Sequence, residues 1–126
     1  MSGKRYFLDT NAIVALLAGD QTLLEKLNQA DYVATSVICE LEYLAFPDLA
    51  DEDKELFEQF RRKVCVADLC SGDVKLKKTI LRLRSEKKIK LPDAIIAASA
   101  MIQNSVLLTE DKQLLNHAGI YSESYL

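Results

Sequence analysis

The sequence predicts an α/β fold with three layers, α/β/α, around a central and mostly parallel sheet. Several short apolar runs lack the polar–apolar alternation of a half-exposed strand, which is typical of strands buried on both faces. Helical patterns separate these runs, so strand–helix–strand crossovers are expected. A chain of 126 residues is long enough for one buried core and too short for two. We therefore expect one domain over residues 1–126.

The first half of the chain alternates between strand and helix. Leucines at helical spacing follow the first apolar run, and Gly19 is a typical helix stop. A second apolar run ends at a Thr-Ser pair that opens another helix. The expected elements are a strand at 6–8, helices at 10–18 and 21–28, a strand at 32–34 and a helix beginning near Ser36.

The second half repeats this order. Residues 51–63 begin with three acids and end with three basic residues, which matches the sign of the helix dipole at each end. Pro92 is suited to the first turn of a helix. The expected elements are helices at 51–63, 73–87 and 92–103, strands at 64–67 and 106–108, and a short helix before His117.

Composition limits the cellular setting and the class of function. Sixteen basic against 19 acidic residues give a net charge of −3, unlike the strongly basic body of a dedicated nucleic-acid binder. Cys39, Cys65 and Cys70 lie in apolar stretches, so we expect small buried side chains in a reducing compartment. No apolar run approaches the length of a membrane span. These observations predict a cytoplasmic protein that does not enter a membrane.

Five acids are placed where a parallel sheet gathers functional groups, beyond the carboxyl ends of its strands. Asp9 directly follows the first strand and Asp111 follows the last, while Asp93 stands in the first turn of a helix. Glu40 and Glu42 belong to the helix after the second strand. Each acid alone has an ordinary explanation, as a helix cap, a partner of a helix dipole or part of a solvated face.

Taken together, these acids indicate a metal site. Clustered carboxylates repel one another unless a cation neutralises them. Their hard oxygen atoms suit Mg²⁺ or Mn²⁺, and two such ions about 4 Å apart can hold the attacking and leaving oxygens of a phosphodiester. The chemistry predicted from the acids is phosphoryl hydrolysis.

Four segments of this chain are similar to the successive motifs of the PIN-domain family. They occur in the same order and at the same spacing as in the family. Within the family, the chain resembles VapC-type toxins, the ribonuclease halves of type II toxin–antitoxin pairs. The segments are Phe7–Asn11, Ser36–Leu44, Leu91–Ala98 and Leu107–Asp111.

The resemblance implies a Mg²⁺- or Mn²⁺-dependent endoribonuclease whose acids bind the metal and activate water. It carries the catalytic and metal-binding roles onto Asp9, Glu42, Asp93 and Asp111. Glu42 is selected because the family places its second acid six residues after the serine, which leaves Glu40 as a possible additional acid. The implied partners are RNA, a cognate VapB-type antitoxin and a second copy of the chain in a homodimer.

Other polar residues have weaker expected roles. Asn11 and Thr109 would orient the acids or bound water through hydrogen bonds, and helix capping explains them equally well. Lys87, Lys88 and Lys90 end a basic run that leads directly to the third acid. They are candidates for contacts with RNA phosphates, although such a run is usually a solvated face.

Two other functions compete with the nuclease. A haloacid dehalogenase-type phosphatase also carries an aspartate after its first strand, but it needs a second aspartate two residues later, where this chain has Asn11. A non-catalytic PIN-like binding module would be expected to lack the acids that this sequence retains.

Overall fold

A five-stranded sheet forms the centre of the computed structural model, which describes residues 3–126 apart from the side chain of Lys87. The strands lie in the order β3-β2-β1-β4-β5, and each neighbouring pair is parallel. The expected α/β fold with a mostly parallel sheet is confirmed. The strands are β1 (Arg5–Leu8), β2 (Tyr32–Ser36), β3 (Cys65–Ala67), β4 (Val106–Leu108) and β5 (Ser122–Glu123).

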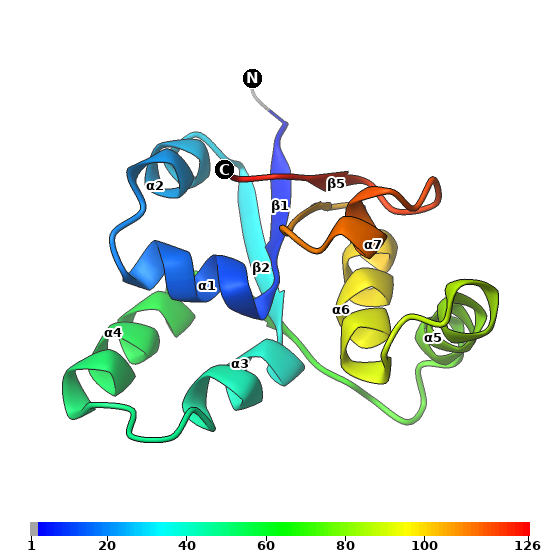
Figure 1. Ribbon diagram of the computed structural model, residues 1–126, viewed down its shortest axis with the longest axis horizontal. Helices are drawn as coiled ribbons and strands as arrows, with labels where there is room; N and C mark the ends of the chain where they lie inside the picture. The colour runs from blue at the N-terminus through cyan, green and yellow to red at the C-terminus, as the bar shows by residue number, and fades with distance from the viewer. Residues whose placement is uncertain (1–2) are drawn as a thin grey trace.

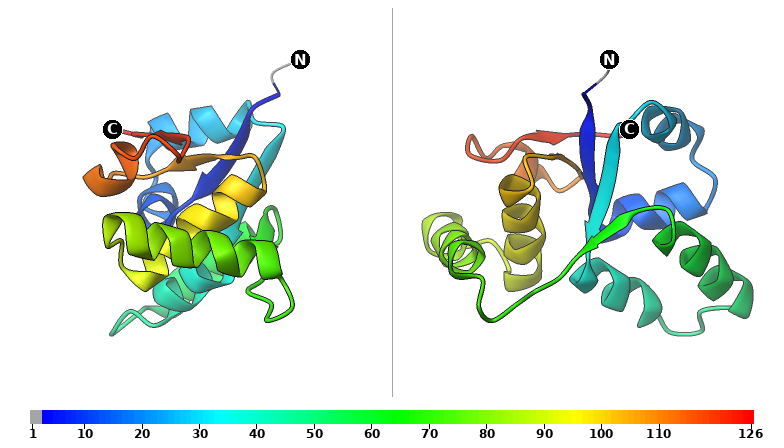
Figure 2. Two further views of the ribbon diagram at one scale, coloured as in Figure 1. Left: turned by 90° about the vertical axis from the view of Figure 1, so that its right-hand side faces the viewer. Right: turned by 180° about the vertical axis from the view of Figure 1, so that it is seen from behind.

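Helices lie on both sides of this sheet and complete the three layers. In Figures 1 and 2, α1, α2 and α4 lie on one side, while α5 and α6 lie on the other. Helix α5 packs chiefly against α6 and lies on the side of α6 that faces away from the sheet. The helices are α1 (Thr10–Leu17), α2 (Gln21–Asn28), α3 (Val37–Leu44), α4 (Asp51–Arg61), α5 (Val74–Lys87), α6 (Leu91–Ile102) and α7 (Lys112–Leu115). None of the helices within residues 3–126 has the length and apolar character needed to span a membrane.

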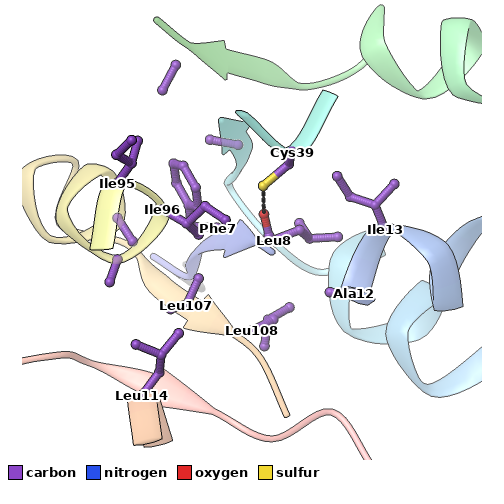
Figure 3. Close-up of a cluster of buried hydrophobic side chains, with 14 of the residues drawn as sticks. Phe7, Leu8, Ala12, Ile13, Cys39, Ile95, Ile96, Leu107, Leu108 and Leu114 are labelled. Carbon is purple, nitrogen blue, oxygen red and sulfur yellow. Dashed lines mark hydrogen bonds between the residues drawn. The ribbon is translucent and has the colours of Figure 1, made fainter. Parts of the chain in front are cut away.

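The central strand is buried on both faces, as the sequence predicted. Phe7 and Leu8 are completely buried between the two helical layers. Figure 3 shows them surrounded by apolar side chains of α1, α6 and β4, and the Cys39 thiol donates to the Leu8 carbonyl at 3.7 Å. Each such side chain stabilises the fold by about 1.5–3 kcal/mol relative to an exposed one. The core therefore fixes β1, from whose end the chain turns into α1.

Acidic and hydroxyl side chains determine where five helices begin. Their oxygens accept hydrogen bonds from backbone N–H groups of the first turn, which have no partner within the helix. Two of the capping residues, Asp9 and Asp111, are also candidate site acids, so the capping explanation holds for both. The capping residues are Asp9, Asp20, Ser36, Asp73 and Asp111.

The third expected strand is less buried than its sequence suggested. β3 is an edge strand that pairs with β2, so one side of its backbone has no strand partner. The expectation of buried cysteines is correct for Cys39 and wrong for Cys65 and Cys70, which are exposed. Apolar neighbours in the sequence did not reveal which strand would lie at the edge.

The short strand β5 was not expected from the sequence. Its residues are polar and have no apolar pattern, so backbone pairing with β4 defines it. The Leu107 N–H donates to the Tyr121 carbonyl at 2.8 Å, and the Thr109 N–H donates to the Glu123 carbonyl at 3.1 Å. These bonds attach the C-terminal segment beside the last candidate acid.

Candidate functional site

The carboxyl ends of β1, β2 and β4 meet beside a pocket of about 230 Å³. The four principal acids expected from the sequence all line it, although they come from parts of the chain far apart in sequence. The lining residues are Asp9, Thr10, Asn11, Glu42, Phe46, Asp93, Ile96 and Asp111. Parallel pairing explains this convergence, because it places the ends of neighbouring strands at one edge of the sheet.

Asp9 is the most buried of the pocket acids, with 9% of its surface exposed. Its carboxylate accepts the Ala12 N–H at 2.8 Å and a hydrogen bond from the Thr109 side chain. Burial raises the pKa of the Asp9 carboxyl, the two hydrogen bonds oppose the rise, and the charges of Asp93 and Asp111 add to it. The two hydrogen bonds therefore hold the Asp9 carboxylate in one orientation, while burial and the neighbouring acids disfavour its charged form.

Asp93 stands in the first turn of α6 and is half-buried. Burial raises the pKa of the Asp93 carboxyl, and the charges of Asp111 and Glu42 raise it further. Lys90, at the N-cap of α6, acts in the opposite direction. The mutual repulsion of these acids is the electrostatic condition that a bound cation would relieve.

Helix α3 separates its two glutamates. Glu42 lines the pocket and its Oε1 accepts the Thr10 hydroxyl at 2.5 Å. Glu40 is not among the lining residues and lies near α4. On α4, the pKa of Arg61 is raised chiefly by its hydrogen bond to Glu58. The charge of Glu40 is close enough to Arg61 to raise that pKa further. Two positions along a helix differ by about 200°, which explains why one glutamate reaches the pocket and the other does not.

Thr109 links two of the acids. It is completely buried, its side chain bonds the Asp9 carboxylate, and its Oγ1 accepts the Asp111 N–H at 3.0 Å. Asn11 is exposed and lines the pocket. Helix capping was the alternative role considered for Asn11 and Thr109. In the structure, the neighbouring Asp9 and Asp111 are the N-caps of α1 and α7.

The donor set fits a hydrated divalent cation. Within residues 3–126, no three acidic, histidine or cysteine side chains lie close enough together to hold one ion as they stand. Mg²⁺ keeps several of its waters and is held directly by one or two carboxylates. Such an ion would need only one or two of the four lining carboxylates as direct ligands and could reach the others through its waters.

The residues that line the pocket include none of Lys88, Lys90 and His117. Lys88 and Lys90 are exposed at the loop before α6, and the side chain of Lys87 lies outside the described part of the structure. His117 is also away from the pocket, and its Nδ1 accepts the Gly119 N–H at 3.0 Å. Sequence reasoning missed Thr10 as the partner of Glu42, although Thr10 directly follows the first acid.

Comparison with known proteins gives one family and a set of similar structures. The family model described as PIN domain matches residues 6–120. Similar chains occur in VapBC2 from Rickettsia felis bound to a promoter DNA fragment (19% identity, 95% of this chain and 98% of that chain covered, TM-score 0.80). Others occur in a toxin–antitoxin complex from Klebsiella pneumoniae (22%, 96% and 98%, TM-score 0.78) and in VapBC-1 from nontypeable Haemophilus influenzae (22%, 96% and 98%, TM-score 0.79). The TM-scores establish a shared fold, and at these identities the matches show the fold alone. No curated protein matches the sequence at a significant level.

Proposed function

The chain belongs to the PIN-domain family, and from this premise we propose that it is a metal-dependent endoribonuclease acting as a VapC-type toxin. The observation that carries the proposal is the convergence of Asp9, Glu42, Asp93 and Asp111 on one pocket. The fold shared with chains of VapBC complexes supports the choice of a toxin with a VapB-type antitoxin partner.

In this proposal the four acids hold Mg²⁺ or Mn²⁺, and the side chains around them fix their orientation. The bound ion would neutralise the acids, polarise the scissile phosphodiester and activate water for attack. The Thr109 side chain holds the Asp9 carboxylate, and the Thr10 hydroxyl holds Glu42 Oε1. Asn11 is exposed at the pocket and is available to contact a substrate phosphate or a water. Such supporting partners are typically worth 10–100-fold in metal affinity or activity.

Expression of the chain alone is expected to arrest bacterial growth, because unopposed RNA cleavage stops protein synthesis. Asp93→Asn should permit growth at the same protein level, since the substitution removes one pocket charge and changes side-chain volume little. Co-expression of the cognate VapB-type antitoxin that the proposal requires should restore growth to cells that make the wild-type protein. Growth is followed by optical density and protein level by immunoblot. Equal arrest by the wild type and the folded variant would contradict the proposed nuclease.

Divalent cations are expected to stabilise the folded protein, because they bind the acidic pocket and not the unfolded chain. At a hundredfold excess over the dissociation constant, Mn²⁺ should add about 2.7 kcal/mol to the free energy of unfolding. For a domain of this size that corresponds to a rise in Tm of roughly 10 °C.

Asp93→Asn should show a much smaller rise in Tm with Mn²⁺, and in metal-free buffer its Tm should exceed that of the wild type. Folding raises the pKa of Asp93, so its charged form is the destabilised one. Differential scanning calorimetry with and without Mn²⁺ measures both effects, and equal shifts in the two proteins would argue against a shared ion.

If Lys88, one of the two exposed lysines before α6, contacts RNA phosphates, Lys88→Gln should weaken RNA binding equally for all RNA sequences. The slope of log affinity against log salt should fall by about 0.7 for a single-stranded RNA. Fluorescence anisotropy at several salt concentrations measures this slope, and Ca²⁺ in place of Mn²⁺ is used to suppress cleavage. Lys54→Gln on α4, also exposed, is the matched control. An unchanged slope in Lys88→Gln would identify the basic run as a solvated face.

A further inference from the structure

Two neighbouring acids after β4 make different contacts. Asp111 lines the pocket and caps α7, whereas Glu110 is not a lining residue. The Glu110 carboxylate instead accepts hydrogen bonds from the last three residues of the chain. Its Oε2 accepts the Ser124 hydroxyl at 2.6 Å, the Tyr125 N–H at 2.6 Å and the Leu126 N–H at 3.2 Å.

The C-terminal segment that Glu110 holds is itself attached to the candidate site. The Glu123 carbonyl accepts the Thr109 N–H at 3.1 Å, and the Glu123 side chain pairs with Lys26 of α2. The Tyr125 side chain is 6% exposed and lies in the core, close enough to Asp9 for that charge to contribute to its raised pKa after burial itself. The segment thus connects the loop after β4 with α2 and with the surroundings of Asp9.

The loop held in this way carries two groups that the site requires. Thr109 bonds the Asp9 carboxylate and the Asp111 N–H, so a displacement of the loop moves Asp111 and removes the partner of Asp9 together. Asp111 is also held by α7, because its Oδ1 accepts the Gln113 N–H in the first turn of that helix. The Glu110 hydrogen bonds to Ser124, Tyr125 and Leu126 attach the loop to the C-terminal segment in addition to the backbone pairing of β5 with β4.

We propose that Glu110 is a positioning residue that fastens the C-terminal segment to the loop 109–111 and thereby fixes Thr109 and Asp111 at the pocket. This inference rests on the proposed function for its effect on metal binding. Glu110 acts through its hydrogen bonds and not as a metal ligand. The distinction is testable, because the two roles respond differently to the loss of charge.

Glu110→Gln removes the charge and keeps the hydrogen-bonding capacity. The remaining carbonyl oxygen can accept the Tyr125 and Leu126 amides, and the new NH₂ group can donate to the Ser124 hydroxyl. Glu110→Ala removes all of these contacts. Ser124→Ala removes the hydroxyl donor without changing an acid, so it gives a milder form of the same defect if Glu110→Ala folds poorly.

The experiment measures Mn²⁺ affinity from the concentration dependence of Tm, without RNA. We expect Glu110→Ala to bind Mn²⁺ about tenfold more weakly, Ser124→Ala to show a smaller loss and Glu110→Gln to stay within about twofold of the wild type. Glu58→Ala, which removes an exposed glutamate bonded to Arg61 on α4, is the control for general destabilisation and should leave the affinity unchanged. The combined loss in Glu110→Ala with Asp111→Asn should be smaller than the sum of the two single losses, because part of the effect of Glu110 is exerted through Asp111. An equal loss in the Gln and Ala variants, or full additivity with Asp111→Asn, would overturn the proposal.

Amide hydrogen exchange of the metal-free protein separates this inference from the proposed function. In Glu110→Ala the Thr109 and Asp111 N–H groups should exchange faster, since the first is bonded to the Glu123 carbonyl of the C-terminal segment and the second to Thr109 Oγ1. In Glu110→Gln they should remain protected. If the wild type binds no Mn²⁺, the proposed function fails and amide exchange alone decides the positioning role. Unchanged exchange in Glu110→Ala would then refute it.

Discussion

Asp93→Asn is expected to lower the rate of Mn²⁺-dependent RNA cleavage by more than about 100-fold, beyond the usual cost of losing a group that merely supports a metal ligand. Asp93 lines the acidic pocket, and its pKa is raised by burial and then by the charges of Asp111 and Glu42. The amide preserves the volume and removes the charge that a cation needs. Cleavage of a mixed RNA pool by the purified protein, followed on denaturing gels, measures the rate.

Asp53→Asn is the matched control for this experiment. Asp53, like Asp93, is a partly buried acid in the first turn of a helix, and it lies outside the acidic pocket. Its substitution should leave the rate within about twofold. Circular dichroism confirms that both variants are folded. Full activity of Asp93→Asn would remove the third acid from the proposed machinery.

Glu42→Gln is expected to produce a loss of cleavage similar to that of Asp93→Asn, whereas Glu40→Gln should retain most of the activity. Glu42 lines the pocket and bonds Thr10, while Glu40 lies near Arg61 outside the lining. The two substitutions are chemically identical and fall on the same helix, so each controls for the other. The same cleavage assay with Mn²⁺ compares them.

The reverse result would identify Glu40 as the second acid. An inactive Glu40→Gln and an active Glu42→Gln would mean that α3 is turned by about half a helical turn relative to the structure. The nuclease proposal would survive this result, because it requires an acid from α3 and not a particular one. Retained activity in both single variants would instead mean that α3 supplies no essential acid.

Much of the fold could be predicted because the signals that define it are local. The apolar run at 6–8 predicts a buried strand wherever the strand lies in the sheet, and Phe7 and Leu8 are buried as expected. Helix starts are local too, since the Asp9 carboxylate reaches an N–H three residues ahead. The sequence alone therefore determined the main strands and helices to within a few residues, and it named Asp9 and Asp93 as candidates for one site.

Only the tertiary structure decided which side chains face one another. Family spacing favoured Glu42 over Glu40, but helical periodicity left both open until the packing of α3 brought Glu42 to the pocket. Strand order likewise placed Cys65 on an exposed edge strand. The attachment of Glu110 to the chain terminus joins residues 14–16 positions apart, and β5 exists through its pairing with β4. Strand formation and helix capping depend on neighbours along the chain, whereas burial at a sheet edge and convergence on a pocket depend on which strands lie side by side, and that is fixed when the whole core packs.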